Sequence, residues 1–259
     1  MNIHLENINK LLQDINLSDS EKQLLLKAVT DADKQWAITD FKLDRTEKVK
    51  KTTAILLKET IEELEQKRKA VEAQNRELEI ESALERVRTV AMAMRKPGDL
   101  LDICKIVYTE LQSLGFIELR NAMINIHNDD KASLLNYDYA DNSGKTVTDI
   151  PYNFHPLVEK QVEVTKNARD AFFEFSFTGE ELKQFRELRK NNGEQDDPKL
   201  EITEALHYYF FSIGTGSIGI STYSAINEEK LELLNRFRNV FNLSYQRYID
   251  ISNAEAQAK

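Results

Sequence analysis

Four polar side chains that share one face of a predicted β-hairpin are the candidate binding site of this sequence. Two strand-like runs, residues 119–127 and 132–139, flank the short polar segment Asn128–Lys131, a pattern typical of a hairpin. Because successive side chains of a strand point to opposite faces, the polar residues of these runs gather on one face and leave the other apolar. The polar residues are Asn125, His127, Asn136 and Asp138.

These four side chains could bind a small polar ligand. Amide, carboxylate and imidazole groups together donate and accept hydrogen bonds, which is what fixes a ligand in a pocket. A symmetric loop would pair residue 127 with 132 and residue 125 with 134, and residues 151–178 would form a lid. In the alternative interpretation, the polar face is exposed to solvent, and the phenylalanines of the lid form its own core instead of a pocket wall.

No other set of residues indicates catalysis or metal binding. The segment Gly214–Gly219 matches G-x-G-x-x-G, but a strand-like run follows it, whereas a dinucleotide-binding loop opens a helix. We therefore expect a tight turn there. The four histidines lack the spacing of metal ligands, and Cys104 lies among apolar helix positions, where burial is expected. The sequence predicts a protein that is not an enzyme and has no metal or cofactor.

Charge and hydropathy exclude several classes of partner. The chain has 35 Lys and Arg against 44 Asp and Glu, a net charge of −9, which disfavours nucleic acid and acidic membranes as partners. No segment has the roughly 18 consecutive apolar residues that a membrane span needs. The N-terminus also lacks the basic and apolar regions of a signal peptide. We therefore expect a cytoplasmic protein.

The distribution of helix-breaking residues divides the chain. All eight glycines and all four prolines lie at or after residue 97. Since these residues break helices, everything before residue 97 is predicted to be helical. The expected parts are a helical cap at residues 1–35, a coiled-coil helix at 36–97, a folded domain at 98–250 and the start of an exit helix at 251–259.

A short helix is expected to end near Asp31, and the coiled-coil helix to be continuous from about Thr46. This helix carries an apolar seam. Its apolar residues recur at spacings of three, four and seven, as in a coiled coil. A second apolar series starts out of phase with the first near residues 78–80. Because such a helix cannot bury its seam alone, we predict a parallel homodimer. The predicted interface comprises Leu57, Ile61, Leu64, Val71, Leu78, Leu84 and Val87.

The phase change between the two series has two interpretations. In the first, Arg68, Asn75 and Ser82 form a weak patch where one packing arrangement gives way to another. In the second, the region is a bistable joint that passes a rotation or a register shift along the helix.

The domain after Gly98 is predicted to belong to the α+β class. Strands are grouped in its middle and helices lie at both ends, which favours an antiparallel sheet flanked by helices. The expected order is a helix at 99–114, the first hairpin, a strand at 147–151, helices near 157–165 and 179–190, a second hairpin at 207–225 and a helix from residue 228.

Part of the chain resembles a known family. The segment Glu79–Arg88, followed by Ala91–Met94 and Leu114–Phe116, is similar to the coil and GAF-like sensor modules found upstream of output domains in bacterial sensor histidine kinases and related cyclases. Residues 41–78 resemble the helical stalks of these proteins. The resemblance implies a five- or six-stranded antiparallel sheet, with terminal helices on one face and a small-molecule pocket on the other.

The sequence departs from ligand-specific members of that family. It lacks the N-K-x-F-D-E pattern of cyclic-nucleotide-binding GAF domains, and Cys104 does not lie where a bilin-binding cysteine would. A single cysteine also differs from the several used by GAF-like methionine sulfoxide reductases. These differences leave the ligand unidentified.

The expected role is a dimeric, non-catalytic sensory module of a two-component system. Its GAF-like domain would bias the parallel coiled coil on binding a small ligand. The similar segments 71–76 and 254–259 suggest that another coil, and an output domain, follow Lys259. The alternative is a dimeric scaffold whose pocket is vestigial and whose partners bind the coil or the cap.

Overall fold

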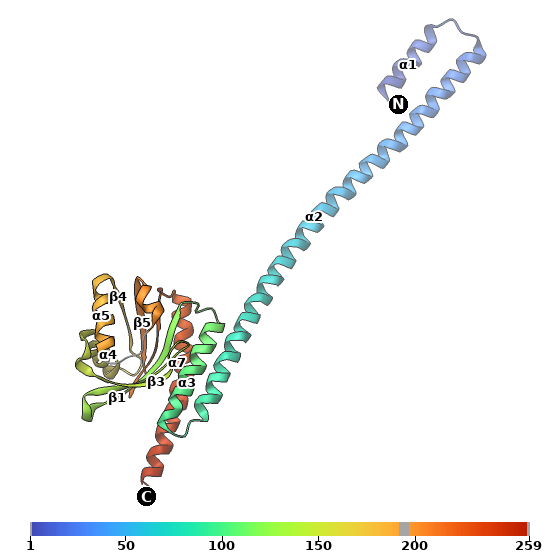
Figure 1. Cartoon of the computed structure of the whole chain (residues 1–259). Helices are drawn as coiled ribbons and strands as arrows, with labels where there is room; N and C mark the ends of the chain where they lie inside the picture. The colour runs from blue at the N-terminus through green and yellow to red at the C-terminus, as the bar shows by residue number, and fades with distance from the viewer. Residues whose placement is uncertain (1, 192–196, 258–259) are drawn as a thin grey trace. The chain divides into compact units, whose positions relative to one another are not determined.

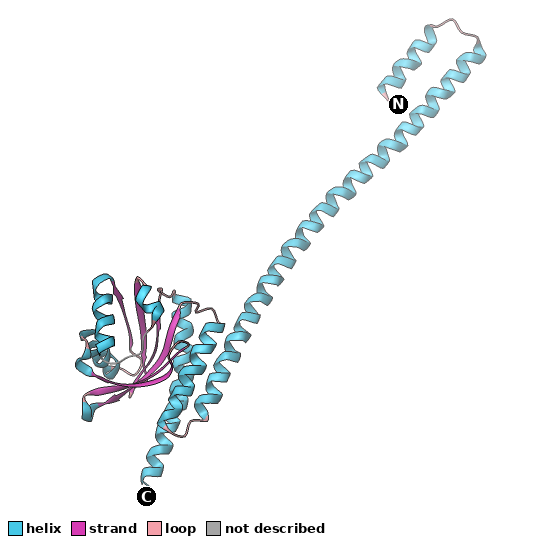
Figure 2. Ribbon diagram, viewed as in Figure 1, coloured by secondary structure: helices cyan, strands magenta, loops and turns pink. Residues whose placement is uncertain are grey.

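The computed structural model describes residues 2–191 and 197–257, which fall into two units, Met1–Gln74 and Asn75–Lys259. The first unit is helical, and the second contains an antiparallel sheet with helices on both faces (Figure 1, Figure 2). The predicted α+β class is therefore confirmed. None of the helices in the described ranges is both long enough and apolar enough to cross a membrane.

The first unit contains helix α1 (Ile3–Asp14) and most of helix α2 (Asp19–Met92). The Asn2 side chain accepts a hydrogen bond from the His4 N–H group at 3.0 Å and caps α1, while the Asn2 N–H donates to Asp33 on α2 at 2.7 Å. The predicted helix end near Asp31 is wrong. Helix α2 continues through this region because neither glycine nor proline interrupts it.

The second unit is built on an antiparallel sheet. Within the described residues it has six strands in the order β3-β2-β1-β6-β5-β4, and every neighbouring pair is antiparallel. Strands β1 and β6 lie at its centre, so their side chains are covered on both faces. The strands are β1 (Leu119–Asn128), β2 (Ser133–Ala140), β3 (Gly144–Pro151), β4 (Phe172–Thr178), β5 (Ala205–Ser212) and β6 (Gly216–Thr222).

Helices cover the two faces of this sheet with separate cores. The larger core joins one face to the end of α2, to α3 (Leu100–Ser113) and to α7 (Glu228–Gln257). The smaller core lies on the opposite face, with α5 (Gly179–Asn191), α6 (Pro198–Ile202) and, packed at its edge, α4 (Pro156–Asn167). Figure 1 shows α3 and α7 on one side of the sheet and α4 and α5 on the other.

The final helix differs from the predicted boundaries. Helix α7 runs without interruption from Glu228 to Gln257, so the exit helix expected at 251–259 is a continuation of the last helix of the domain. Residues 258–259 lie outside the described ranges.

The first hairpin has a different register from the predicted one. Asn125 pairs with Asn136 and His127 with Leu134, a shift of two residues from the symmetric loop. The turn is longer because Ala132 adopts a left-handed conformation, with φ of 48°, after a short 3-10 helix. A shift by an even number leaves each side chain on its face, so the polar set predicted from the sequence stays together.

The second apolar series of α2 is buried inside the chain. Leu84 and Val87 are 4% and 0% exposed and belong to the core that contains α3 and α7. The prediction that these two residues form a dimer interface is therefore wrong, because their own domain covers them. The phase change marks the place where α2 begins to pack on the domain, and the compact unit begins at Asn75 and not at residue 98.

We expect the substitution Leu84→Ala to lower the free energy of unfolding of the second unit by about 2–5 kcal/mol, because it opens a cavity in a packed core. Urea denaturation followed by near-ultraviolet circular dichroism measures this loss. Thr109→Ala, at an exposed position of α3, is the control and should change the free energy by less than about 0.5 kcal/mol. Equal effects of the two substitutions would contradict the assignment of Leu84 to the core.

Candidate functional site

A small polar cavity lies within the sheet face that α4 and α5 cover. Its volume is about 70 Å³, room for a few water molecules or a ligand of a few heavy atoms. Strands β1 and β2 contribute polar side chains to it, β4 and β5 contribute aromatic side chains, and residues of α4 and α5 complete the lining. Three of the four residues predicted from the sequence line this cavity, namely Asn125, Asn136 and Asp138.

His127, the fourth predicted residue, does not line the cavity. Its Nε2 atom lies 3.3 Å from Thr165 Oγ1, and its ring packs edge-on against Tyr152. Burial, together with the nearby charge of Lys166, lowers the pKa of His127 to about 4. The imidazole is therefore neutral at neutral pH, and we remove it from the site.

The amides of the cavity form a connected chain of hydrogen bonds. Asn136 Nδ2 donates to Asn125 Oδ1 at 2.8 Å, and Asn125 Nδ2 donates to Ser217 Oγ at 3.2 Å. From the other side, Gln161 Nε2 on α4 donates to the same Ser217 Oγ at 3.1 Å. This chain links β2, β1, β6 and α4, and it fixes which edge of each amide faces the cavity.

A β-bulge brings into the site a charged residue, Arg120, that the alternation of side chains along the strand did not predict. The pairing of β1 with β6 shifts between Leu119 and Asn121, which leaves Arg120 as an extra residue in β1. Such a bulge redirects side chains, and both Arg120 and Asn121 line the cavity.

Arg120 forms a buried ion pair with Asp197. Its Nε atom lies 2.8 Å from Asp197 Oδ2, and the two side chains are 6% and 4% exposed. Burial alone would raise the pKa of Asp197, but the charge and hydrogen bond of Arg120 outweigh it and lower the pKa. Asp197 also accepts hydrogen bonds from the Tyr223 hydroxyl and the Leu200 N–H group. The carboxylate is therefore ionised and held in place.

A second polar link connects β2 to this ion pair. Asn121 Nδ2 donates to Asp138 Oδ2 at 2.9 Å, and Asn121 Oδ1 accepts hydrogen bonds from the Ser221 N–H and hydroxyl groups. Ser221 Oγ in turn lies 3.4 Å from Arg120 Nη1. Asp138, Asn121, Ser221 and Arg120 thus form a hydrogen-bonded chain across β2, β1 and β6 that leads to Asp197.

Aromatic rings form the apolar wall of the cavity. Phe175 stacks on Tyr208 with ring centroids 4.9 Å apart, and Phe177 stacks on Phe185 at 4.1 Å. All four rings line the cavity, as does Phe154. The predicted lid at residues 151–178 is partly wrong, because Phe172–Thr178 is the edge strand β4 and only residues 152–171, which include α4, lie outside the sheet.

The combination of groups limits what the cavity can bind. Two buried arginines, Arg120 and Arg189, and the carboxylate Asp138 line the cavity, and Asp197, which pairs with Arg120 behind it, brings the formal charge of the four side chains to zero. Because a net charge is costly to bury, this composition suits a small uncharged or zwitterionic molecule. The amides would bind its polar groups, and the aromatic wall would contact its apolar part.

The other features singled out in the sequence have structural roles. Gly214, with φ of 84°, forms the turn between β5 and β6, which confirms the predicted tight turn. A Cβ atom at Gly216 would lie 1.8 Å from the Asn125 carbonyl oxygen. The Cys104 thiol is buried and donates to the Tyr137 carbonyl, and burial raises its pKa. In the described ranges, no three His, Cys, Asp or Glu side chains are grouped to hold a metal ion.

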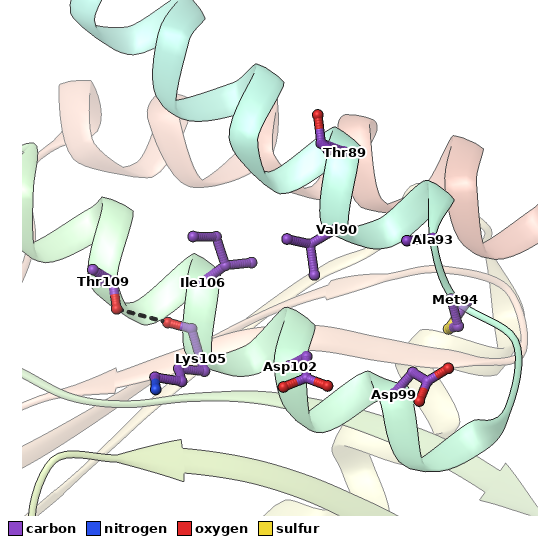
Figure 3. Close-up of a pocket in the computed structure, with 9 residues that line it drawn as sticks. All are labelled: Thr89, Val90, Ala93, Met94, Asp99, Asp102, Lys105, Ile106 and Thr109. Atoms are coloured by element: carbon purple, nitrogen blue, oxygen red, sulfur yellow. Dashed lines mark hydrogen bonds between the residues drawn. The ribbon is translucent and has the colours of Figure 1, made fainter.

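A larger but open groove lies on the opposite side of the domain, between the end of α2 and α3. Figure 3 shows Val90 of α2 and Ile106 of α3 directed into the space between the two helices, with Thr89 pointing away from α3. Its volume is about 710 Å³. The groove has none of the buried polar groups that the cavity contains, so we treat it as a surface and not as a ligand site.

No protein-family model and no curated protein matches this sequence. Function is therefore inferred from the residues and geometry of the chain itself.

We expect the single substitution Asp197→Asn to lower the free energy of unfolding by about 3–5 kcal/mol, because it leaves the buried Arg120 guanidinium without its paired charge. In the double variant Arg120→Met with Asp197→Asn, more than half of this loss should be recovered, since no unpaired charge remains. Urea denaturation measures both values. A single variant as stable as the original protein would contradict the buried ion pair.

Proposed function

We propose that this protein is a dimeric, non-catalytic sensory module of a cytoplasmic bacterial signalling protein. A GAF-like domain would bind a small ligand and bias a parallel coiled coil that leads to an output domain. The observation that carries this proposal is the double role of α2. One uninterrupted helix contributes buried residues to the domain that contains the polar cavity and also carries a row of exposed apolar side chains.

The layer arrangement of the second unit supports the GAF-like assignment. The antiparallel sheet has the end of α2, α3 and α7 on one face, and the polar cavity lies within the opposite face. The resemblance of residues 79–116 to GAF-like modules implies this division between the faces. The order of strands and helices along the chain is also compatible with it.

The exposed seam of α2 supports dimerisation. Its five residues Leu57, Ile61, Leu64, Val71 and Leu78 are 49–60% exposed. If a dimer buried these five side chains fully in both copies, it would be stabilised by on the order of 10 kcal/mol, at roughly 1 kcal/mol for each side chain. This is comparable to the cost of association, and further exposed apolar residues such as Val49 and Ile55 would add to it.

The central strand β1 could couple the ligand to the coil. Its residue Asn125 lines the cavity, while its neighbour Ile124 points to the other face and lies in the core that contains Leu84 and Val87 of α2. A ligand shifts such a system only if it binds one arrangement more tightly than the other. Displacement of β1 by a ligand would supply that difference in affinity.

A dimeric scaffold with a vestigial pocket is the second candidate. The observation in its favour is the small volume of the cavity, about 70 Å³, together with amides that already bond to one another. In that case the buried polar network would only stabilise the fold, and partners would bind the helical unit.

Leu64→Asp should convert the protein from a dimer to a monomer at micromolar concentration, because a carboxylate in an apolar seam costs several kcal/mol to bury. Gln66→Asp is the matched control, since Gln66 lies two residues away on the outer side of the same helix. Light scattering after size-exclusion chromatography reports the number of copies. If the unsubstituted protein elutes as a monomer, the proposed dimer is wrong.

Native mass spectrometry of the purified protein tests the ligand. We expect a bound small molecule in the original protein and in His127→Gln, whose position lies outside the cavity, but not in Asn136→Leu, which removes a cavity amide. An adduct retained by Asn136→Leu would place the ligand elsewhere. Protein free of any adduct would favour the scaffold.

A further inference from the structure

We infer that the two copies of α2 remain paired as far as Met92, along a polar seam formed by Ser82, Glu85, Thr89 and Met92. The occupant of this seam is the α2 helix of a second copy of the chain, lying beside the groove between α2 and α3. The inference rests on the proposed parallel dimer and extends its interface into the second unit.

The heptad repeat of α2 continues without interruption into this seam. With Ile61 at position a and Leu57, Leu64, Val71 and Leu78 at position d, Arg68 and Asn75 also fall at a, followed by residues 82 and 89, and residues 85 and 92 fall at d. No residue is inserted or deleted between the apolar and the polar stretch. All four residues of the polar seam are exposed.

The domain covers the opposite side of the same heptads. The buried residues of this stretch, Ala83, Leu84, Val87 and Ala91, occupy the outer positions b, c and f, and none is more than 4% exposed. These positions point away from the partner in a two-stranded coil. Each domain can therefore pack on the outer side of its own α2 and leave the inner side open to the second helix.

Concave surfaces follow the polar seam along the domain. Three hollows lie one after another beside the seam and share lining residues. The first is lined by Leu78 and Ser82, the second by Ser82 and Thr89, and the third by Thr89 and Ala93. Helix α3 contributes Ile106 to two of them, and Figure 3 shows this residue between the helices. The seam thus has an unfilled depression beside it, where a second helix would find a partly apolar contact.

The charges beside the seam fit a parallel, in-register partner. In that arrangement each g residue meets the e residue five positions later on the other helix. Lys67 would meet Glu72, a pair of opposite charge, whereas Glu81 and Arg86 are bonded to Arg236 and Glu110 of their own domain. The remaining g–e pairs between residues 60 and 93 each contain an uncharged residue, so no g–e pair joins like charges: Thr60 with Glu65, Gln74 with Glu79 and Arg88 with Ala93.

The polar composition makes this a weak part of the coil. Ser82, Glu85 and Thr89 replace the leucine and isoleucine of the upper seam, and two Glu85 carboxylates would face each other across the dimer. Glu85 is paired with Arg88 of its own helix, which limits the repulsion. Because the same stretch of α2 packs on the domain through Leu84 and Val87, it is the segment whose pairing the domain can change.

Cysteine crosslinking tests this interface directly. Ser82→Cys and Thr89→Cys should form disulfide-linked dimers under mild oxidation about tenfold faster than Glu187→Cys, an exposed position on α5. Leu64→Cys, in the apolar seam, is the positive control. The natural Cys104 is buried and does not compete. All four substitutions are at exposed positions, so the fold tolerates them.

The outcomes separate this inference from the proposed dimer. If Leu64→Cys crosslinks while Ser82→Cys and Thr89→Cys are as slow as Glu187→Cys, the dimer stands and the extended seam is wrong. If Leu64→Cys also fails, the dimer itself is wrong.

Glu85→Leu gives an independent measure. It should lower the dimer dissociation constant about tenfold or more, because it replaces two facing carboxylates with apolar side chains. An unchanged or higher dissociation constant, measured by analytical ultracentrifugation, would overturn the inference.

Discussion

An apolar stripe on a long helix must be covered, and α2 carries two such stripes on opposite sides. The stripe that contains Leu84 and Val87 is covered by α3 and α7 of the same chain, so the helix becomes part of the domain core. The stripe from Leu57 to Leu78 has no cover within the described residues. The same element is therefore both a wall of the folded domain and an unsatisfied surface. The fold, the proposed assembly and the proposed coupling all depend on this double role.

The polar interior of the smaller core needs a different explanation. Apolar side chains of similar volume would stabilise a core at least as well as a buried ion pair, yet Arg120, Asp197 and three asparagines are grouped there. Their hydrogen bonds hold them in defined orientations around a small space instead of filling it. Precise placement of polar groups within an aromatic enclosure is what recognition of a small molecule requires.

Part of this arrangement could be predicted from the sequence because it depends on local rules. Alternation along the first hairpin identified Asn125, Asn136 and Asp138, and the confinement of glycine and proline identified the long helix. Arg120 could not be predicted, since a bulge changes the facing of one residue without any mark in the composition. Arg189 lines the cavity, and Asp197 pairs with Arg120, from elements distant in sequence. The domain boundary was misplaced because helix breakers show where a helix ends, and not where it begins to pack.

The two-residue difference between the expected and observed hairpin register has an evolutionary consequence. The face that a side chain occupies depends only on whether a register shift is odd or even. The turn between β1 and β2 can therefore gain or lose residues in pairs while Asn136 and Asp138 stay on the cavity face. A single-residue insertion that carried β2 along by one position would exchange Asn136 and Asp138 for Leu135 and Tyr137. Length variation among descendants of this chain should therefore be tolerated in steps of two at this turn.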